Sequence, residues 1–133
     1  MASKYTVNEA AGTVLDTETG LTWQREVSAD VYTWAAAKSY AARMDLDGGG
    51  WRLPTVEELF GLVDRTRINP AIDTVAFPNT PIEYFWTVTP WVAGGSAWFV
   101  SFDDGFSVFA APSSALSGAV CAVRRWRRRR LTI

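Results

Sequence analysis

Apolar residues in the N-terminal third of the chain follow patterns that predict a hairpin and a helix. In the segment GTVLDTETGLTWQRE, short strand-like runs over residues 13–15 and 21–24 flank a turn signal at 16–20, which predicts a β-hairpin. Further on, Thr33 is a good N-cap, and apolar residues follow it at helical spacing: Trp34, Ala37, Ala41 and Met44. This pattern predicts a helix of about three turns that ends before Gly48.

A second helix is indicated by the strongest local signal in the sequence. Thr55 and Glu58 form the capping box Thr-x-x-Glu, and Pro54 and Leu59 stand at the two positions of a hydrophobic staple. The apolar residues of this segment fall on one helical face: Leu59, Leu62 and Val63. We therefore predict a helix from about residue 56 to residue 64.

The C-terminal half contains the alternating segment AWFVSFDDGFSVFAA, which predicts a second hairpin. Asp104 and Gly105 are suited to a two-residue turn because both positions of such a turn favour positive φ. One face of this hairpin must pack on the helices, and the other is either a second core layer or an exposed aromatic platform. The pattern leaves both open. The turn pairs Asp103 with Phe106, Ser101 with Val108, and Phe99 with Ala110.

The stretch DGGGWRLPTVEEL, beginning at Asp47, places three glycines before the second predicted helix. Such glycines can form a phosphate-binding loop, but only where they run directly into the helix N-terminus. Here residues 51–54 intervene, and Glu57 and Glu58 in the first helical turn would repel a phosphate. The sequence therefore predicts that this stretch is a structural joint.

Size, aromatic content and charge narrow the class of protein. A chain of 133 residues fits one domain, which we place at residues 1–125, followed by a basic tail at 126–133. Seven Trp and seven Phe exceed what a minimal core needs, so part of the aromatic surface is expected to contact a partner. The net charge of −1 includes six arginines in the last ten residues, so the rest of the chain is strongly acidic. No nucleic-acid partner is expected of such a body.

Catalysis and metal binding find little support. The chain has no histidine, which removes the usual general base for Ser or Cys nucleophiles and the commonest zinc ligand. Asp45 and Asp47 begin a pattern typical of a calcium loop, but Gly49 and Val56 stand where later ligands belong. We therefore expect a protein that is not an enzyme and that needs no cofactor or metal.

Five segments carry a resemblance to a known family. They occur in the same order and at similar spacing to the motifs of the bacterial Lcl C-terminal-domain family, and they cover nearly the whole chain: DTETGLTWQR, TWAAAKSYA, GGGWRLPTVEEL, FWTVTP and CAVRR. The resemblance implies an α+β, C-type-lectin-like fold with two helices, a twisted antiparallel sheet, and paired N- and C-terminal strands. It also implies adhesion, including binding of sulfated polysaccharides, and a cell-surface or secreted location.

The resemblance further implies roles for individual residues. Trp51, Arg52 and Glu58 would be structural, with the Arg and the Glu satisfying each other near the core. Many relatives pair the cysteine before the final VR with a cysteine in the first helix, where this chain reads SYAARM. Cys121 is therefore expected to be a buried free thiol.

Three functions fit these observations. The first is a lectin-like adhesion or recognition module that binds a glycan or protein through the C-terminal sheet face and adjacent loops. The second is a hypervariable display protein diversified by a retroelement, which a neighbouring reverse transcriptase gene would indicate. The third is a structural subunit that forms homo-oligomers through its apolar surface and arginine tail. For the first function we predict five ligand-binding residues: Trp91, Ser101, Asp103, Phe106 and Val108.

Targeting signals are absent from the sequence. No run of about 18 apolar residues appears, so no transmembrane segment is predicted. The first ten residues, MASKYTVNEA, lack the basic and then apolar layout of a secretory signal. The residues themselves therefore predict no location.

Overall fold

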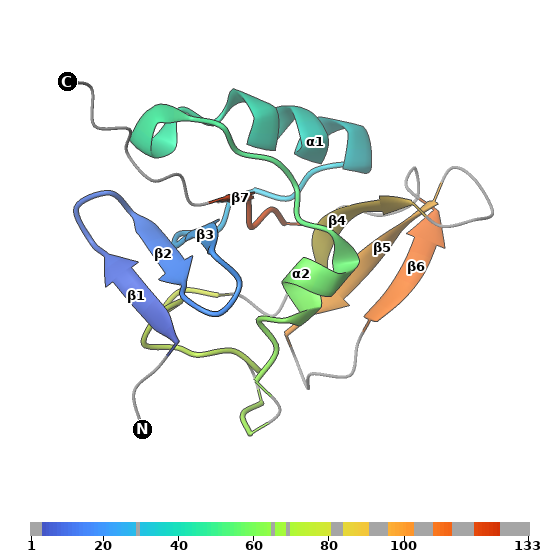
Figure 1. The fold of residues 1–133 in the computed structure, drawn as a ribbon. Coiled ribbons are helices and arrows are strands. Elements are labelled where there is room, and N and C mark those ends of the chain that lie inside the picture. The colour runs from blue at the N-terminus through green and yellow to red at the C-terminus, as the bar shows by residue number, and fades with distance from the viewer. Residues whose placement is uncertain are drawn as a thin grey trace.

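The part of the chain that the structure describes has an α+β fold with two α-helices and two antiparallel sheets, which confirms the predicted class at this level (Figure 1). The family resemblance implied one antiparallel sheet, whereas the described strands form two separate sheets. The computed structural model describes residues 4–28, 30–64, 66–68, 70–80, 84–90, 96–102, 108–112 and 119–125, with backbone alone for Ser96 and residues 108–112.

The first sheet has the order β1-β2-β3-β7. Its strands are β1 (Tyr5–Asn8), β2 (Thr13–Asp16), β3 (Leu21–Gln24) and β7 (Val123–Arg125). The predicted N-terminal hairpin is β2 and β3, and its turn is closed because the Asp16 carboxylate accepts from the backbone N–H groups of Glu18 and Thr19. The C-terminal strand β7 pairs with β3, whereas the first strand β1 lies at the opposite edge.

The second sheet has the order β4-β5-β6. Its strands are β4 (Tyr84–Pro90), β5 (Ser96–Ser101) and β6 (Val108–Pro112). The predicted hairpin is formed by β5 and β6, but its predicted register is wrong by one residue. Val100, and not Ser101, pairs with Val108, and Phe99 pairs with Phe109 in place of Ala110. This pairing leaves an odd number of residues between the strands, which a two-residue turn cannot close.

Both faces of β5 are buried. Phe99 on one face and Val100 on the other have no exposed surface, and the Phe99 ring lies 3.9 Å from the Trp86 ring, centroid to centroid. The second face of β5 is therefore a second core layer and not an exposed aromatic platform. Because both faces are apolar, alternation along β5 could not show which residues pair.

The first helix, α1 (Trp34–Arg43), forms as predicted. The Thr33 hydroxyl accepts from the backbone N–H of Ala36 at 3.3 Å, and Ala37 and Ala41 are buried on the face that packs on the core. A short 3-10 helix, η1 (Leu46–Gly48), follows it and leads into the glycine-rich stretch.

The second helix, α2 (Val56–Phe60), begins at the predicted capping box but ends earlier than predicted. Beyond Phe60 the backbone N–H groups of Leu62 and Val63 donate to carbonyls three residues back, and the N–H of Asp64 donates to the distant carbonyl of Ala71. Leu62 and Val63 therefore lie in a tighter turn with hydrogen bonds to the third residue back, and not in a further turn of α-helix.

We expect Thr55→Ala to lower the free energy of unfolding by about 1 kcal/mol. The Thr55 hydroxyl accepts from the Glu58 N–H at 3.2 Å, and the Glu58 carboxylate accepts from the Thr55 N–H at 2.8 Å, so the substitution breaks the capping box. Urea denaturation measures the change. Thr55→Ser keeps the hydroxyl and serves as the control; an equal loss in both variants would contradict the capping explanation.

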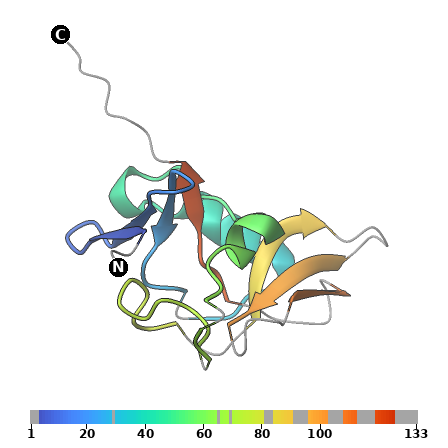
Figure 2. The same ribbon diagram turned by 60° about the horizontal axis from the view of Figure 1, so that its bottom comes forward.

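The segment leading into β7 joins the two sheets. Ala119 forms a parallel bridge with Phe85 of β4, and Val123 pairs with both β3 and Arg52. Figures 1 and 2 show β7 and the chain before it between the N-terminal strands and β4. The residues of this segment therefore belong to the cores on both sides.

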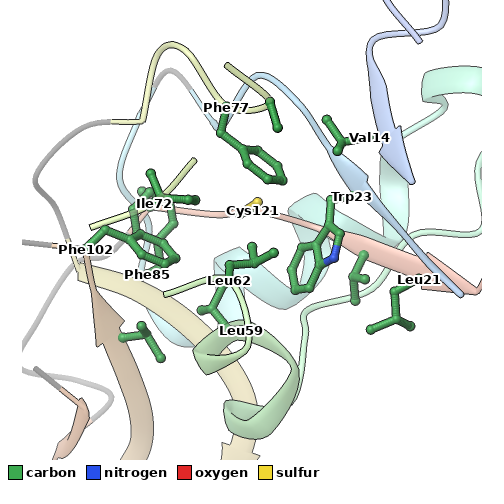
Figure 3. Close-up of a cluster of buried hydrophobic side chains, with 14 residues drawn as sticks. Val14, Leu21, Trp23, Leu59, Leu62, Ile72, Phe77, Phe85, Phe102 and Cys121 are labelled. Atoms are coloured by element: carbon green, nitrogen blue, oxygen red, sulfur yellow. The ribbon is translucent and has the colours of Figure 1, made fainter. Parts of the chain in front are cut away.

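The described residues contain two clusters of buried side chains that form core. The larger contains Trp23, Phe77, Phe85, Phe102 and Cys121, drawn in Figure 3, and packs beneath β2, β3 and α2. The smaller lies between α1 and the second sheet and contains Ala37, Ala41, Trp51, Leu53, Trp86, Ala97, Phe99, Val120 and Ala122.

Candidate functional site

The glycine-rich stretch forms a turn in an unusual backbone conformation. Asp47, Gly48, Gly49 and Gly50 have φ angles of 47°, 92°, 82° and 83°. Residues other than Gly, Asn and Asp rarely adopt such positive φ angles, which explains why this turn consists of one Asp and three Gly residues.

Arg124 of β7 holds the turn in place. One guanidinium nitrogen, Nη1, donates to the carbonyl oxygens of Asp47 at 2.8 Å and Gly49 at 2.7 Å, and Nη2 donates to the Asp47 carboxylate at 2.6 Å. The guanidinium carbon lies 4.5 Å from the centroid of the Trp51 ring. The turn thus directs carbonyl oxygens at a cation of its own chain. A phosphate loop would direct N–H groups at an anion, so this arrangement fits the predicted structural joint.

A groove of about 780 Å³ opens between this turn and the outer face of the first sheet. Its floor follows the strand register, because Thr6, Leu15, Thr22 and Arg124 are direct neighbours across β1, β2, β3 and β7. A second row on the same face contains Asn8 and Thr13. The turn forms one wall, and the full lining is Thr6, Asn8, Thr13, Leu15, Thr22, Asp47, Gly48, Gly49, Gly50, Arg52, Arg124 and Arg125.

Carboxylates balance most of the positive charge in this groove. Arg124 is paired with Asp47. Arg52 donates to both oxygens of Glu58, at 2.8 and 2.9 Å, as the family resemblance implied, although the Arg52 side chain is 44% exposed and not buried. The hydrogen bonds from Arg52 are the main reason that the pKa of Glu58 lies below its usual value. Among the described residues, Arg125 is the groove cation that has no ion-pair partner.

Ser101 is the one predicted ligand-binding residue whose side chain is described, and it does not line this groove. Trp91, Asp103 and Phe106 lie outside the described residues. Val108 is in β6, where only its backbone is described. Ser101 is in β5, where it pairs with Tyr84 and is 5% exposed, so its hydroxyl is not presented to solvent. The predicted patch as a whole stays a prediction.

The groove could not be predicted because the sequence patterns did not indicate the strand β1, which forms part of its floor. The strand reads Tyr-Thr-Val-Asn, and the polar side chains of Thr6 and Asn8 alternate with those of Tyr5 and Val7, which pack against the core. That alternation was the available signal, but a strand of four residues gives only two repeats of it.

Cys121 is a free, buried thiol, as expected. Its sulfur contacts the backbone carbonyl of Gln24 at 3.6 Å, and burial raises the pKa of the thiol to about 12. Figure 3 shows it among apolar side chains of the larger core cluster. A thiol in this position is neither nucleophile nor metal ligand at neutral pH.

We expect Cys121 in the native protein to resist a thiol-specific reagent at about pH 8, since almost none of it is ionised and the reagent has no access. The same reagent should modify one thiol per chain once the protein is unfolded in urea, which serves as the control. Absorbance of the released chromophore follows both reactions. Fast, complete modification without urea would show that the larger core cluster opens readily.

The described residues contain no group of three or more His, Cys, Asp or Glu side chains arranged to hold a metal ion. The carboxylate of Asp47, the second acidic residue of the calcium-like pattern, is paired with Arg124. Within the same residues, no helix has the length and apolar character to span a membrane.

Comparison with known proteins identifies the family. No curated protein matches the chain. Residues 12–124 match the family described as the Lcl C-terminal domain, a match that runs from the start of the β2–β3 hairpin to Arg124 in β7. The resemblance seen in the sequence motifs is thereby confirmed, and the chain belongs to the Lcl C-terminal domain family.

Proposed function

We propose that this domain is a non-enzymatic recognition module that binds a glycan or a protein in the groove beside the Asp47–Gly50 turn. The observation that carries the proposal is the groove itself, where the exposed side chains of Thr6 and Asn8 lie beside a turn already fixed by Arg124. A binding surface held rigid before the ligand arrives loses less conformational entropy on binding.

The chemistry of the groove favours binding over catalysis. Its nucleophile candidates are threonine hydroxyls, and no histidine exists in the chain to act as their base. The remaining strong nucleophile, Cys121, is buried with a raised pKa. Of the carboxylates near the groove, Asp47 is already bound by Arg124, and the hydrogen bonds from Arg52 lower the pKa of Glu58, which favours its ionised form over that of a general acid.

A C-type-lectin-like fold is part of this proposal. It is supported by family membership, by the two helices, and by the pairing of β7 with the N-terminal hairpin. Adhesion at a cell surface follows from the resemblance in the same way. The C-terminal patch predicted from the sequence is the second candidate surface, and it rests on the residues other than the buried Ser101.

An array of glycans and extracellular proteins, probed with the full chain, tests the proposal. Thr6→Tyr places a large side chain at an exposed position of the groove and should abolish binding to whichever probe is recognised. Ala42→Tyr, at an exposed position of α1, is the matched control and should bind normally. A chelator should change neither result. Binding that Thr6→Tyr leaves intact would move the site away from the groove, and the absence of any bound probe would reject the recognition function.

A further inference from the structure

We infer that the outer side of α1 carries a second binding site, which takes an acidic peptide segment of a protein partner through one apolar side chain and a carboxylate beside it. The site is a hollow of about 520 Å³, called the α1 hollow below, and its lining is Tyr32, Ala36, Ser39, Tyr40, Arg43 and Met44. The inference goes beyond the proposed function, because none of the described residues that line the groove also lines the α1 hollow.

The α1 hollow exists because a small residue stands among larger ones. Ala36, Tyr40 and Arg43 are spaced by four and three residues, so they lie on one face of the helix. Ala36 adds only a methyl group to this face, and the tyrosine rings rise on either side of it. A different side of the helix, which carries Ala37, is buried in the core, and α1 lies along the outside of the molecule (Figure 1). The hollow therefore opens outward.

Both tyrosines of the α1 hollow are held from inside the protein. The carbonyl of Tyr32 accepts from the indole N–H of the buried Trp86 at 2.7 Å. The hydroxyl of Tyr40 accepts from the side chain of the buried Gln24 at 3.5 Å. The two rings lie 5.0 Å apart, centroid to centroid, and pack against the smaller core cluster. A site fixed in this way loses little conformational entropy when a partner fills it.

The charge of the α1 hollow selects an anion. Among the described residues of the lining, Arg43 is the one that carries a charge, and no described carboxylate forms an ion pair with it. The acidic residues on either side in the sequence, Asp30 and Asp45, do not line the hollow. The C-terminal end of a helix carries about half a negative charge, which is less than the full positive charge of Arg43. The net attraction is therefore for a carboxylate.

The residue types of the lining fit a protein partner. Tyr, Met and Arg are enriched at the centres of protein interfaces, and Tyr and Arg are enriched among the residues that carry most of the binding energy. The rings of Tyr32 and Tyr40 and the side chain of Met44 provide apolar contact around the space above the helix. Ser39 and Arg43 are one turn apart, so both can donate to one carboxylate. An apolar residue followed by Asp or Glu presents both groups.

Peptide selection on the full chain tests the inference. The probe is a displayed library of random heptapeptides, selected at about 0.3 M NaCl to weaken general attraction to the arginine tail. Enriched peptides are then synthesised and titrated by fluorescence anisotropy. We expect them to share an aromatic or large aliphatic residue close to Asp or Glu.

Two matched pairs of variants locate the binding. Arg43→Glu reverses the charge in the α1 hollow and should weaken binding at least about tenfold. Lys38→Glu makes the same change of charge on the same helix but outside the lining, and should weaken it less than about threefold. Ala36→Phe fills the hollow and should abolish binding, whereas Ala35→Phe, at the exposed neighbouring position, should leave it intact. Far-UV circular dichroism checks that each variant keeps its helix.

The contrary outcomes are distinct. If Lys38→Glu weakens binding as much as Arg43→Glu, overall charge and not the α1 hollow attracts the peptides, and the inference fails. It also fails if no peptide is enriched, or if the enriched peptides bind Ala36→Phe normally, as peptides held by the arginine tail would. Thr6→Tyr should leave peptide binding unchanged. Peptides that Thr6→Tyr releases bind the groove, a result that supports the proposed function and contradicts this inference.

Discussion

Replacing Arg124 with alanine is expected to lower the free energy of unfolding by about 2–3 kcal/mol, one of the largest effects of any charged residue in this protein. The substitution leaves the carbonyl oxygens of Asp47 and Gly49 and the Asp47 carboxylate without the donor that now binds all three. The Arg124 side chain is only 20% exposed, but the Asp47 side chain is 46% exposed, so water compensates part of the loss. Urea denaturation followed by tryptophan fluorescence measures the change.

Two further variants show whether the geometry of the guanidinium is responsible. Arg125→Ala removes the same charge one residue later, where the side chain is exposed, and should change stability by less than about 0.5 kcal/mol. Arg124→Lys keeps the charge but cannot reach two carbonyls and a carboxylate in one plane, so it should fall between wild type and Arg124→Ala. If Arg124→Ala and Arg125→Ala unfold at the same urea concentration, the turn is held by other contacts.

The second large effect is expected at Trp86, where replacement by phenylalanine should lower the free energy of unfolding by about 3 kcal/mol. Trp86 has no exposed surface, and its indole N–H donates to the carbonyl of Tyr32 at 2.7 Å. The substitution therefore leaves a cavity and also leaves a carbonyl without its donor.

Trp23 provides the matched comparison. It is 1% exposed in the larger core cluster, but its indole N–H has no hydrogen-bond partner among the described residues (Figure 3). Trp23→Phe also leaves a cavity, but it removes a buried donor that was already unsatisfied, so the loss should be smaller, about 1 kcal/mol. Equal losses at the two positions, measured by urea denaturation, would indicate that the Trp23 N–H has a partner such as a buried water.

Elements specified by neighbouring residues could be predicted from the sequence. The cap at Thr33, the capping box at Thr55, and the turn closed by Asp16 each depend on groups a few residues apart, and all three are present as expected. The end of α2 was placed too late because the contact that redirects the chain, from Asp64 to Ala71, has no signature in the spacing of apolar residues.

Features that join distant parts of the chain could not be predicted. The bond from Arg124 to Asp47 spans 77 residues, and nothing near either residue indicates the other. The same holds for the groove, whose floor exists only because β7 pairs with β3 and thereby brings Arg124 beside Thr22. The register of β5 with β6 failed for another reason: with Phe99 and Val100 both buried, the sequence offers two apolar faces and no polar one to fix the pairing.

The position of residues 119–125 between the two sheets has a consequence for how the protein folds. Ala119 pairs with β4, Val123 pairs with β3 and Arg52, and the Gln24 side chain accepts from the N–H of Ala122 across 98 residues. Neither sheet can complete its hydrogen bonding until this segment has left the ribosome, so the N-terminal strands are synthesised long before their last partner exists. Such dependence on contacts far apart in sequence slows folding. Until then the β3 edge lacks its partner β7, and an unpaired strand edge of this kind exposes a partly folded chain to aggregation.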